Sequence, residues 1–412
     1  MSLELIKGIL IATVPLLVIF PTLFAFTTWV ERKALARIQN RIGPDKVGIP
    51  LTRYGGPFSI FGLGQPAADG IKMLFKEDIV PAGADRFFHL LAPILVLIPA
   101  MVVLCFLPLD LSVIVFWDSQ LALDIKAVQG FAMDGAVIFF FALSGLATLA
   151  VFMAGWASRN KYSLLGGMRA IAQMVSYEIP LVLSAVVVVM ATGSLSASKI
   201  VSQQEFLWFV FTPWGFTAFV IFFICALAET NRSPFDLPEA ESEIIAGYFT
   251  EYSGFKFALF FLGEYIAMFA ISGLAVTLFL GGGNGPASDN AWIACGWFLA
   301  KLFALIAVMI WLRGTLPRLR VDQLMSFAWK FLLPLSLLNI FVTGAALHLL
   351  GGGDLKGLAK HGDVLFQTIY QANPMVVGAL WIVSGMILYL AATGLDNLNR
   401  SKARPREKLY FE

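Results

Sequence analysis

The chain has 412 residues, of which 58% are apolar and only 14% are charged, whereas soluble domains carry about 45–50% apolar and about 25% charged residues. So few charges cannot cover a water-soluble surface, and the near balance of 29 basic against 27 acidic side chains excludes a nucleic-acid binder steered by net charge. The three cysteines lie singly in apolar runs, which excludes a disulfide framework and a CxxC metal site. The composition predicts an integral membrane protein.

Nine apolar runs are long enough to cross a bilayer core, which takes about 20 helical residues. Because the runs are continuous and do not alternate with polar residues, they predict helices rather than the strands of a barrel. The expected fold class is therefore an all-α polytopic membrane protein. The runs are 9–30, 89–109, 135–157, 171–192, 206–228, 255–280, 291–312, 329–350 and 375–395.

The distribution of basic residues predicts how these spans are oriented. Connections that follow odd-numbered spans, together with the tail after the ninth, hold 23 of the 29 lysines and arginines. Basic residues favour the cytoplasmic side of a membrane. We therefore expect the N-terminus outside and the C-terminal tail inside.

The first inside connection, residues 31–88, is too long for a turn and is expected to carry its own structure. Pro66 suits the first position of a helix, and up to residue 76 apolar side chains fall on one face and charged side chains on another. This pattern predicts a helix lying at the membrane interface. It can serve as a simple anchor or as a platform beside an opening for a lipid-soluble substrate.

Just before it, Lys33, Arg37 and Arg41 recur every four residues, which predicts that they share one face of a helix extending the first span. One interpretation is an anchor that keeps positive charge inside. The other is that Arg32 and Arg41 hold positive charge where an anionic headgroup forms.

An acidic segment follows the fifth span, on the side where basic residues are expected. Six carboxylates fall within the 23 residues from Glu229 to Glu251, and only Arg232 opposes them before Lys256. In a poorly hydrated setting such groups share protons or are held protonated. The segment predicts a chain of proton-exchanging groups.

Two carboxylates of this segment, Glu239 and Glu241, admit a second interpretation. Glu239 and Glu243 lie one helical turn apart and repel each other when both are ionised. For Glu239 and Glu241 the alternative is that Pro238 opens a helix whose acidic first turn complements the helix dipole.

Charged residues also fall within the predicted spans. Glu178 lies in the fourth span, Glu264 in the sixth and Lys301 in the seventh. A charge there costs about 2.5–3.5 kcal/mol on insertion scales, so such residues are candidates for function. They predict a polar track toward mid-membrane, or else a buried Glu–Lys pair that joins helices.

The sequence contains no recognisable site for a redox group. Gly62-Leu63-Gly64 lacks the strand, third glycine and acidic residue of a dinucleotide fingerprint, and there is no Walker-type loop. His89, His348 and His361 fall at depths that do not pair around a haem, and no iron–sulfur spacing exists. If the protein serves redox chemistry, its electrons are expected to come from a partner.

Several segments in order resemble one family, the H subunits of proton-pumping NADH:quinone oxidoreductase (respiratory complex I). They are Trp29–Pro44 (WVERKALARIQNRIGP), Gln65–Lys72 (QPAADGIK), the acidic loop Ala228–Glu243, the pairs Glu251-Tyr252 and Glu264-Tyr265, and Arg318–Met325 (RLRVDQLM). The resemblance covers residues 1–350.

The resemblance implies a subunit at the junction of the membrane and peripheral arms, where the family forms much of a quinone chamber and its opening to the lipid. The expected quinone-binding residues are Glu31, Arg32, Arg41, Asp69, Lys72 and Asp236. The expected proton-path residues are Tyr177, Glu178, Glu229, Glu239, Glu241, Glu243, Glu251, Glu264 and Lys301. No side chain is assigned to catalysis or to a metal.

The resemblance also implies the surroundings of the chain. Quinone, as ubiquinone or menaquinone, is the expected substrate, with no haem, flavin or iron–sulfur cluster held by this chain. The expected partners are iron–sulfur subunits of the peripheral arm, antiporter-like membrane subunits and lipid in a bacterial inner membrane, without nucleic acid. The family core has eight spans, so residues 351–412, with the ninth span and a basic tail, depart from it.

Two other functions stay open at this point. One is the corresponding subunit of a membrane-bound hydrogenase, which pumps without quinone. The other is a stand-alone ion-coupled secondary transporter, whose buried carboxylates would bind substrate or ion. Transporters of that kind usually show repeat symmetry and broken helices at mid-membrane, which the sequence does not display.

Overall fold

The computed structural model describes residues 3–45, 47, 62–104, 107, 134–205, 207–237, 246–286 and 291–350, with 378, 381–386, 389 and 393 near the C-terminus. Glu239, Glu241, Glu243 and most of the predicted ninth span lie outside the described residues. Within the described part every regular element is a helix.

The longer helices follow the apolar runs of the sequence. They are α1 (Leu3–Ile38), α3 (Arg86–Leu104), α6 (Ala136–Ala157), α7 (Lys161–Thr192), α9 (Pro213–Glu229), α11 (Gly254–Phe279), α12 (Ala291–Thr315) and α14 (Leu333–Leu350). Shorter elements are α2 (Gln65–Phe75), α8 (Ala197–Ser202), η1 (Phe209–Phe211), η2 (Gly247–Phe249), α13 (Val321–Phe327) and the π-helical turn η3 (Ala328–Leu332).

By length and hydropathy, six helices in the described ranges could cross a membrane, counting Val321–His348 as one continuous helix. α9 is apolar too but has only 17 residues. The expectation of an all-α protein built from membrane-length helices is therefore confirmed. The predicted interfacial helix also exists, as α2, and none of its residues is buried.

Two predicted spans begin elsewhere. α7 starts at Lys161, ten residues before its predicted span, because Asn160 accepts a hydrogen bond from the backbone N–H of Tyr162 and caps the helix. α9 starts at Pro213 rather than at 206, because Thr212 caps it and proline occupies the first helical turn. Capping residues, rather than the limits of the apolar run, set both starts.

The prediction that Lys33, Arg37 and Arg41 share one helical face is wrong for Arg41. α1 ends at Ile38, and Asn40 takes a left-handed backbone with φ of 55°. Asparagine tolerates this conformation, which ends the helix. Arg41 therefore lies in the turn after α1, where its Nε donates to Gln39.

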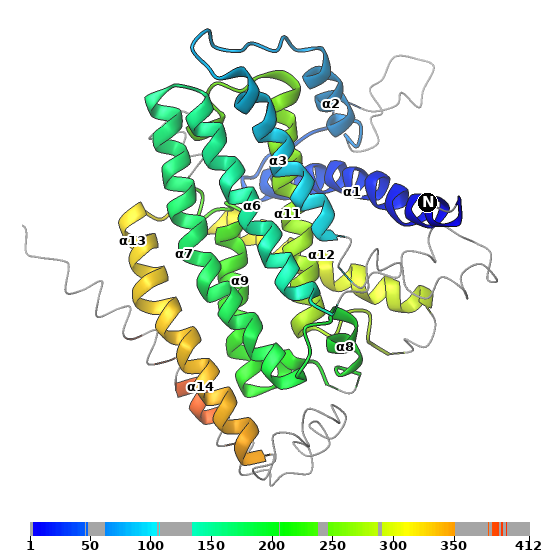
Figure 1. Cartoon of the computed structure of the whole chain (residues 1–412), viewed down its shortest axis with the longest axis vertical. Helices are drawn as coiled ribbons and strands as arrows, with labels where there is room; N and C mark the ends of the chain where they lie inside the picture. The colour runs from blue at the N-terminus through cyan, green and yellow to red at the C-terminus, as the bar shows by residue number, and fades with distance from the viewer. Residues whose placement is uncertain are drawn as a thin grey trace, which may run out of the picture.

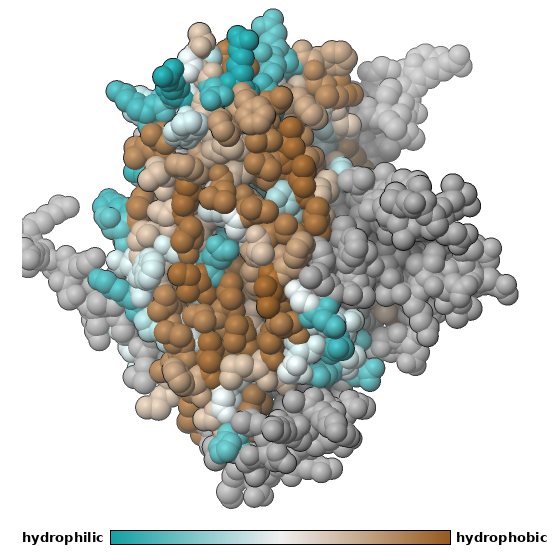
Figure 2. Space-filling model, in the orientation of Figure 1, coloured by the Kyte–Doolittle hydropathy of each residue, from teal (hydrophilic) through white to brown (hydrophobic). Residues whose placement is uncertain are grey.

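Five helices form the centre of the protein. Figure 1 shows α3, α6, α7, α9 and α11 running along its long axis, with α14 at one side and α1 and α12 slanting away on the other. Large side chains such as Phe222, Phe269 and Phe279 are fully buried between them. Figure 2 shows a broad apolar band across this face, with hydrophilic side chains gathered at its upper end. The band is typical of a surface that contacts lipid or other membrane helices.

Glycines allow α7 to approach its neighbours closely. A Cβ on Gly155 of α6 would lie 3.3 Å from the Cα of Gly167, and one on Gly166 would lie 2.7 Å from the Cα of Gly247 in η2. Small residues at such crossings let helices pack backbone to backbone. Gly166 therefore fixes η2, which carries Tyr248, against α7.

We predict that Gly166→Ala destabilises the protein, because the added methyl group meets backbone atoms of η2 that cannot rotate away. The expected cost is about 1–3 kcal/mol, as for overpacked cores. The measurement is the temperature at which the detergent-extracted protein loses its gel-filtration peak. Gly296→Ala is the matched control, because a Cβ there meets nothing within 4 Å. Equal melting of the two variants would contradict the assignment.

Candidate functional site

The turn after α9 is held by a buried glutamine of α7. The side-chain amide of Gln173 donates to the backbone carbonyls of Ala228 at 2.8 Å and Phe235 at 2.6 Å, and Gln173 is fully buried. Asn231, with φ of 49°, turns the chain between these two carbonyls. The amide therefore folds the acidic segment back on itself and directs Arg232 into the protein.

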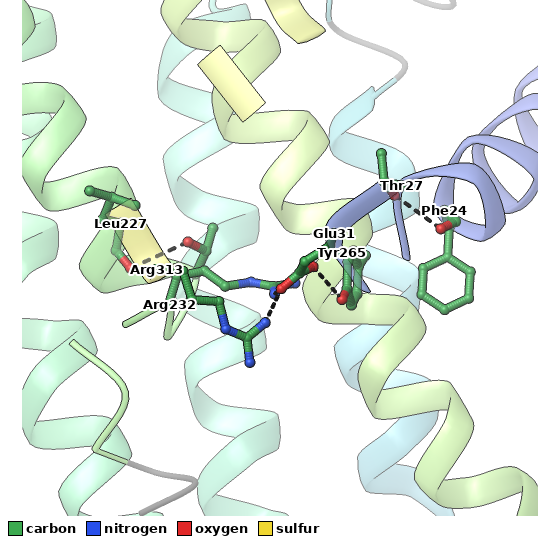
Figure 3. Close-up of polar contacts among 8 residues, drawn as sticks. Phe24, Thr27, Glu31, Leu227, Arg232, Tyr265 and Arg313 are labelled. Carbon is green, nitrogen blue, oxygen red and sulfur yellow. Dashed lines mark hydrogen bonds and ion pairs between the residues drawn. The ribbon is translucent and has the colours of Figure 1, made fainter. Parts of the chain in front are cut away.

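Glu31 of α1 is the centre of a buried ion cluster formed with Arg232, Tyr265 and Arg313 (Figure 3). Nη1 of Arg232 lies 2.9 and 3.2 Å from the two carboxylate oxygens of Glu31, and the Tyr265 hydroxyl donates to it at 2.6 Å. Arg313 of α12 also donates to Glu31. One carboxylate thus joins α1, α11, α12 and the turn after α9.

Arg232 is charged inside this ion cluster. Burial alone would lower its pKa, but the Glu31 carboxylate, Tyr265 and Glu264 raise the pKa well above its ordinary value. Its guanidinium also lies over the Tyr265 ring, 4.1 Å from the ring centroid. A permanent positive charge is therefore buried between Glu31 and Glu264.

The second feature is a carboxylate cavity of about 70 Å³ lined by residues of α3, α6, α7, α9 and α11. Glu229, Glu264 and Tyr248 line it, among mostly apolar side chains. The Tyr248 hydroxyl donates to Glu264 at 3.1 Å. Oε2 of Glu229 is buried with no hydrogen-bond partner among the described residues. The cavity brings together two of the predicted proton-path residues.

Glu178 of α7 lies against α6, outside the residues that line the carboxylate cavity. Its Oε1 lies 3.5 Å from the position of a Cβ on Gly145, and its charge interacts with that of Glu229. The absence of a side chain at Gly145 leaves room for this carboxylate between the two helices. Three predicted proton-path residues thus lie within electrostatic reach of one another.

The ion cluster and the carboxylate cavity are neighbours, because α11 and the end of α9 with its following turn each contribute residues to both. On α11, Glu264 lines the cavity and the next residue, Tyr265, binds Glu31. After α9, Glu229 lines the cavity and Arg232 enters the cluster three residues later. The charge of Arg232 therefore interacts with the carboxylates of both Glu31 and Glu264.

Two further predicted residues accept hydrogen bonds from side chains of other segments. Buried Asp236 accepts from Nη2 of Arg318 at 2.8 Å, and Glu251 accepts from the Asn160 amide at 2.7 Å. Next to Glu251, the pKa of Tyr252 is raised because burial disfavours the phenolate. Glu251 thus contacts the residue that caps the start of α7. Ser253, two residues further on, contacts the backbone after α2, so Glu251 lies at the same end of the helix bundle as α2.

The remaining quinone-binding candidates lie on exposed surfaces of α1 and α2. Arg32 pairs with Asp69, which also accepts from the Gln65 amide at 3.0 Å. Lys72 is exposed on α2. The contact between Arg32 and Asp69 joins the end of α1 to the interfacial helix.

Lys301 is not brought to the carboxylates among the described contacts. Its ammonium donates to the carbonyls of Leu280, Gly282 and Asn284 at 2.7, 3.0 and 2.6 Å. These carbonyls follow the C-terminal end of α11. It also lies over the Trp208 ring, 4.0 Å from the centroid. The predicted Glu–Lys pair is therefore wrong for these residues, and Lys301 caps a helix.

Tyr177 faces away from Glu178. Its hydroxyl donates to the Leu324 carbonyl at 3.0 Å and the side chain is fully buried. Consecutive residues on a helix point about 100° apart, and Tyr177 does not line the carboxylate cavity. Among described residues no group of histidines, cysteines and carboxylates could hold a metal ion.

Sequence reasoning missed four contributors: Gln173, Tyr248, Arg313 and the role of Arg232 as a buried partner. In the sequence, Arg313 contributes only to the count of basic residues on the cytoplasmic side. Nothing in the sequence distinguishes Gln173 or Tyr248 from other polar residues. Glu31 is the signal that could have led to the two arginines, because a carboxylate buried between membrane helices needs a cationic partner.

The described elements are all helices, and several are long enough to cross a membrane. Arginine and carboxylate side chains are buried between them. These features define the class as a polytopic membrane protein with charged groups in its core. The chain belongs to the NADH dehydrogenase family, whose family model matches residues 11–344. The resemblance read from its motifs is thereby confirmed.

Relatives in distant bacteria support the assignment. The H subunit of NADH-quinone oxidoreductase from Geobacillus kaustophilus is 48% identical over 323 residues, covering 77% of this chain and 89% of the relative. The protein of the same name from Thermomicrobium roseum is 46% identical over 333 residues, covering 78% and 91%. That from Protochlamydia amoebophila is 45% identical over 322 residues, covering 78% and 92%.

We predict that Glu31→Gln destabilises the protein far more than Asp69→Asn does. Removing one partner of a buried ion pair costs about 3–5 kcal/mol, whereas the exposed pair of Asp69 with Arg32 is worth about 0–1 kcal/mol. Thermal melting of the two extracted variants, measured against the unaltered protein, checks this difference. Melting of Glu31→Gln at the unaltered temperature would show that the cluster does not hold α1 in place.

Proposed function

We propose that this chain is the membrane-arm subunit of NADH:quinone oxidoreductase that forms part of the quinone chamber and couples quinone reduction to proton translocation. The names of its relatives support the enzyme complex. One observation carries the coupling role: the Arg232–Glu31 ion cluster adjoins the carboxylate cavity of Glu229 and Glu264.

The quinone headgroup binds near the contact between α1 and α2. Arg32, Asp69 and Lys72 offer hydrogen bonds and positive charge there. Arg41, in the turn after α1, and Asp236, beside Arg318, line the same chamber. A two-electron reduction of a quinone takes up two protons, so charged groups around the headgroup must exchange protons with it.

Electrons reach the quinone from a partner's iron–sulfur cluster in the peripheral arm. Antiporter-like membrane subunits are the other partners, and they receive the proton signal.

The coupling is electrostatic and does not require a continuous chain of hydrogen bonds. Negative charge on the reduced headgroup competes with Glu31 for Arg232 and Arg313, which weakens the hold of Arg232 on Glu264. Coupled carboxyl groups titrate together, so a change at Glu264 changes the proton occupancy of Glu229 and Glu178. Glu251 belongs to this path, as do Glu239, Glu241 and Glu243, which lie outside the described residues.

The two remaining members of the predicted path act at its borders. Tyr177 binds the Leu324 carbonyl on the chamber side of α7, and Lys301 fixes the far end of α11. Their contribution is to position the helices that carry the carboxylates.

We further propose the topology that the basic residues indicate. Nine spans place the N-terminus outside and the C-terminal tail inside the bacterial inner membrane. Residues 1–350 form the chamber and the proton path, and residues 351–412 form an extension with the ninth span. The ring of Trp381 lies 6.3 Å from that of Phe216 in α9, which supports packing of the extension on the core.

We predict that Glu264→Gln and Glu229→Gln each lower proton translocation coupled to quinone reduction by about tenfold or more, as expected for loss of a proton-transfer group. The measurement is NADH-driven proton uptake by vesicles that contain the purified, assembled complex. Tyr248→Phe, which removes only the donor to Glu264, should give a smaller loss.

Glu205→Gln is the matched control, because Glu205 is exposed on the loop before α9. Normal pumping by assembled Glu264→Gln and Glu229→Gln complexes would overturn the coupling role. A purified assembly that evolves hydrogen without reducing quinone would instead identify a hydrogenase subunit. A protein purified alone and active in ion-driven uptake would identify a transporter.

A further inference from the structure

A groove outside the quinone and proton sites lies where α2 meets the first turns of α3 and α11. The groove has a volume of about 440 Å³. Its apolar lining is Leu74, Leu90, Pro93, Ile94, Phe255 and Leu259, and its charged lining is Lys76, Asp78 and Lys256. None of these residues belongs to the ion cluster or the carboxylate cavity.

The apolar wall of the groove is continuous with the surface that faces the membrane. Leu90, Pro93 and Ile94 lie at positions i, i+3 and i+4 of α3 and therefore on one face. Leu90 is 54% exposed and Phe255 is 51% exposed. Such large apolar side chains at the end of membrane-length helices need an apolar partner.

The charged rim stands at the polar end of that wall. Lys256 pairs with Asp78 at 2.8 Å, which leaves donors of its ammonium unused. Within the described residues, no carboxylate lies at ion-pair distance from Lys76, which is exposed. Two lysines against one aspartate give the rim a net positive charge.

The rim is rigid, because the end of α2 is fastened to the start of α11. Ser253 accepts from the backbone N–H of Ile79 at 2.9 Å and donates to the Glu77 carbonyl at 3.2 Å. A Cβ on Gly254, which has φ of 58°, would lie only 3.1 Å from the Lys76 carbonyl. The backbone that carries Lys76 therefore keeps its place beside Lys256.

We propose that this groove binds one anionic phospholipid, with the phosphate between Lys76 and Lys256 and an acyl chain along Leu90, Ile94 and Phe255. A lysine contributes to binding of an anionic headgroup at a membrane surface, and exposed apolar area beside it suits an acyl chain. Free phosphate would satisfy the rim but not the wall. The position of α2 across the end of α3 and α11 (Figure 1) makes the lipid a filler between three helices.

The test uses the protein purified in its native assembly and placed in nanodiscs that contain phosphatidylglycerol with a photoactivatable acyl chain. After illumination, peptide mapping should find the adduct in the segments of Leu90–Ile94 and Phe255–Leu259. Lys76→Glu should lower this labelling about fivefold or more. Ile94→Trp, which fills the groove without changing charge, should lower it as well. Gel filtration confirms that both variants stay assembled.

Lys161→Glu is the control, since Lys161 is an exposed lysine at the start of α7, outside the groove. Its labelling should be unchanged. Excess dioleoylphosphatidylglycerol should compete with the probe, whereas inorganic phosphate should not. Equal labelling by a photoactivatable phosphatidylcholine, full labelling of Lys76→Glu, or displacement by excess ubiquinone would each overturn the proposal.

Discussion

The contact between Glu31 and Arg232 is the interaction on which the ion cluster depends, because a buried charge is costly unless it is paired or hydrogen-bonded. Glu31 comes from the first helix of the chain and Arg232 from a turn some two hundred residues later, and the two meet at 2.9 Å. Removing Glu31 leaves Arg232 buried without its carboxylate partner, whereas removing Arg232 leaves Glu31 with Arg313 alone. Through Glu31 the cluster joins α1, the turn after α9, α11 and α12.

This constraint explains why the acidic segment has its particular shape. Arg232 reaches Glu31 only if the chain turns sharply after α9, and Gln173 supplies the hydrogen bonds that hold such a turn inside the protein. The same turn brings Glu229 to the wall of the carboxylate cavity, three residues before the arginine. The turn after α9 thus both pairs Arg232 with Glu31 and places Glu229 at the cavity. It brings the ion cluster next to Glu229 without a continuous chain of hydrogen bonds between them.

Helix type and approximate position could be predicted from the sequence, because long apolar runs and one amphipathic segment carry a strong periodic signal. Glu264 could also be selected, since a carboxylate within an apolar run is conspicuous. Its partner could not: Tyr248 lies in a short 3₁₀ turn whose contacts depend on the close approach of Gly166. The partners of Lys301 could not be predicted for a related reason. Its sequence position indicates mid-span depth, but the carbonyls that bind it belong to a loop that folds back over the helix end.

Both ends of α11 are anchored, and this limits how that helix can respond. Ser253 and Gly254 attach its first turn to the backbone after α2, and the ammonium of Lys301 binds the carbonyl groups at its other end. A piston-like displacement along the helix axis would break both attachments at once. A change at Glu264 or Tyr265, in the middle of α11, is therefore expected to involve side-chain rotamers rather than movement of the helix. No backbone hydrogen bond of α11 has to be exchanged in such a change.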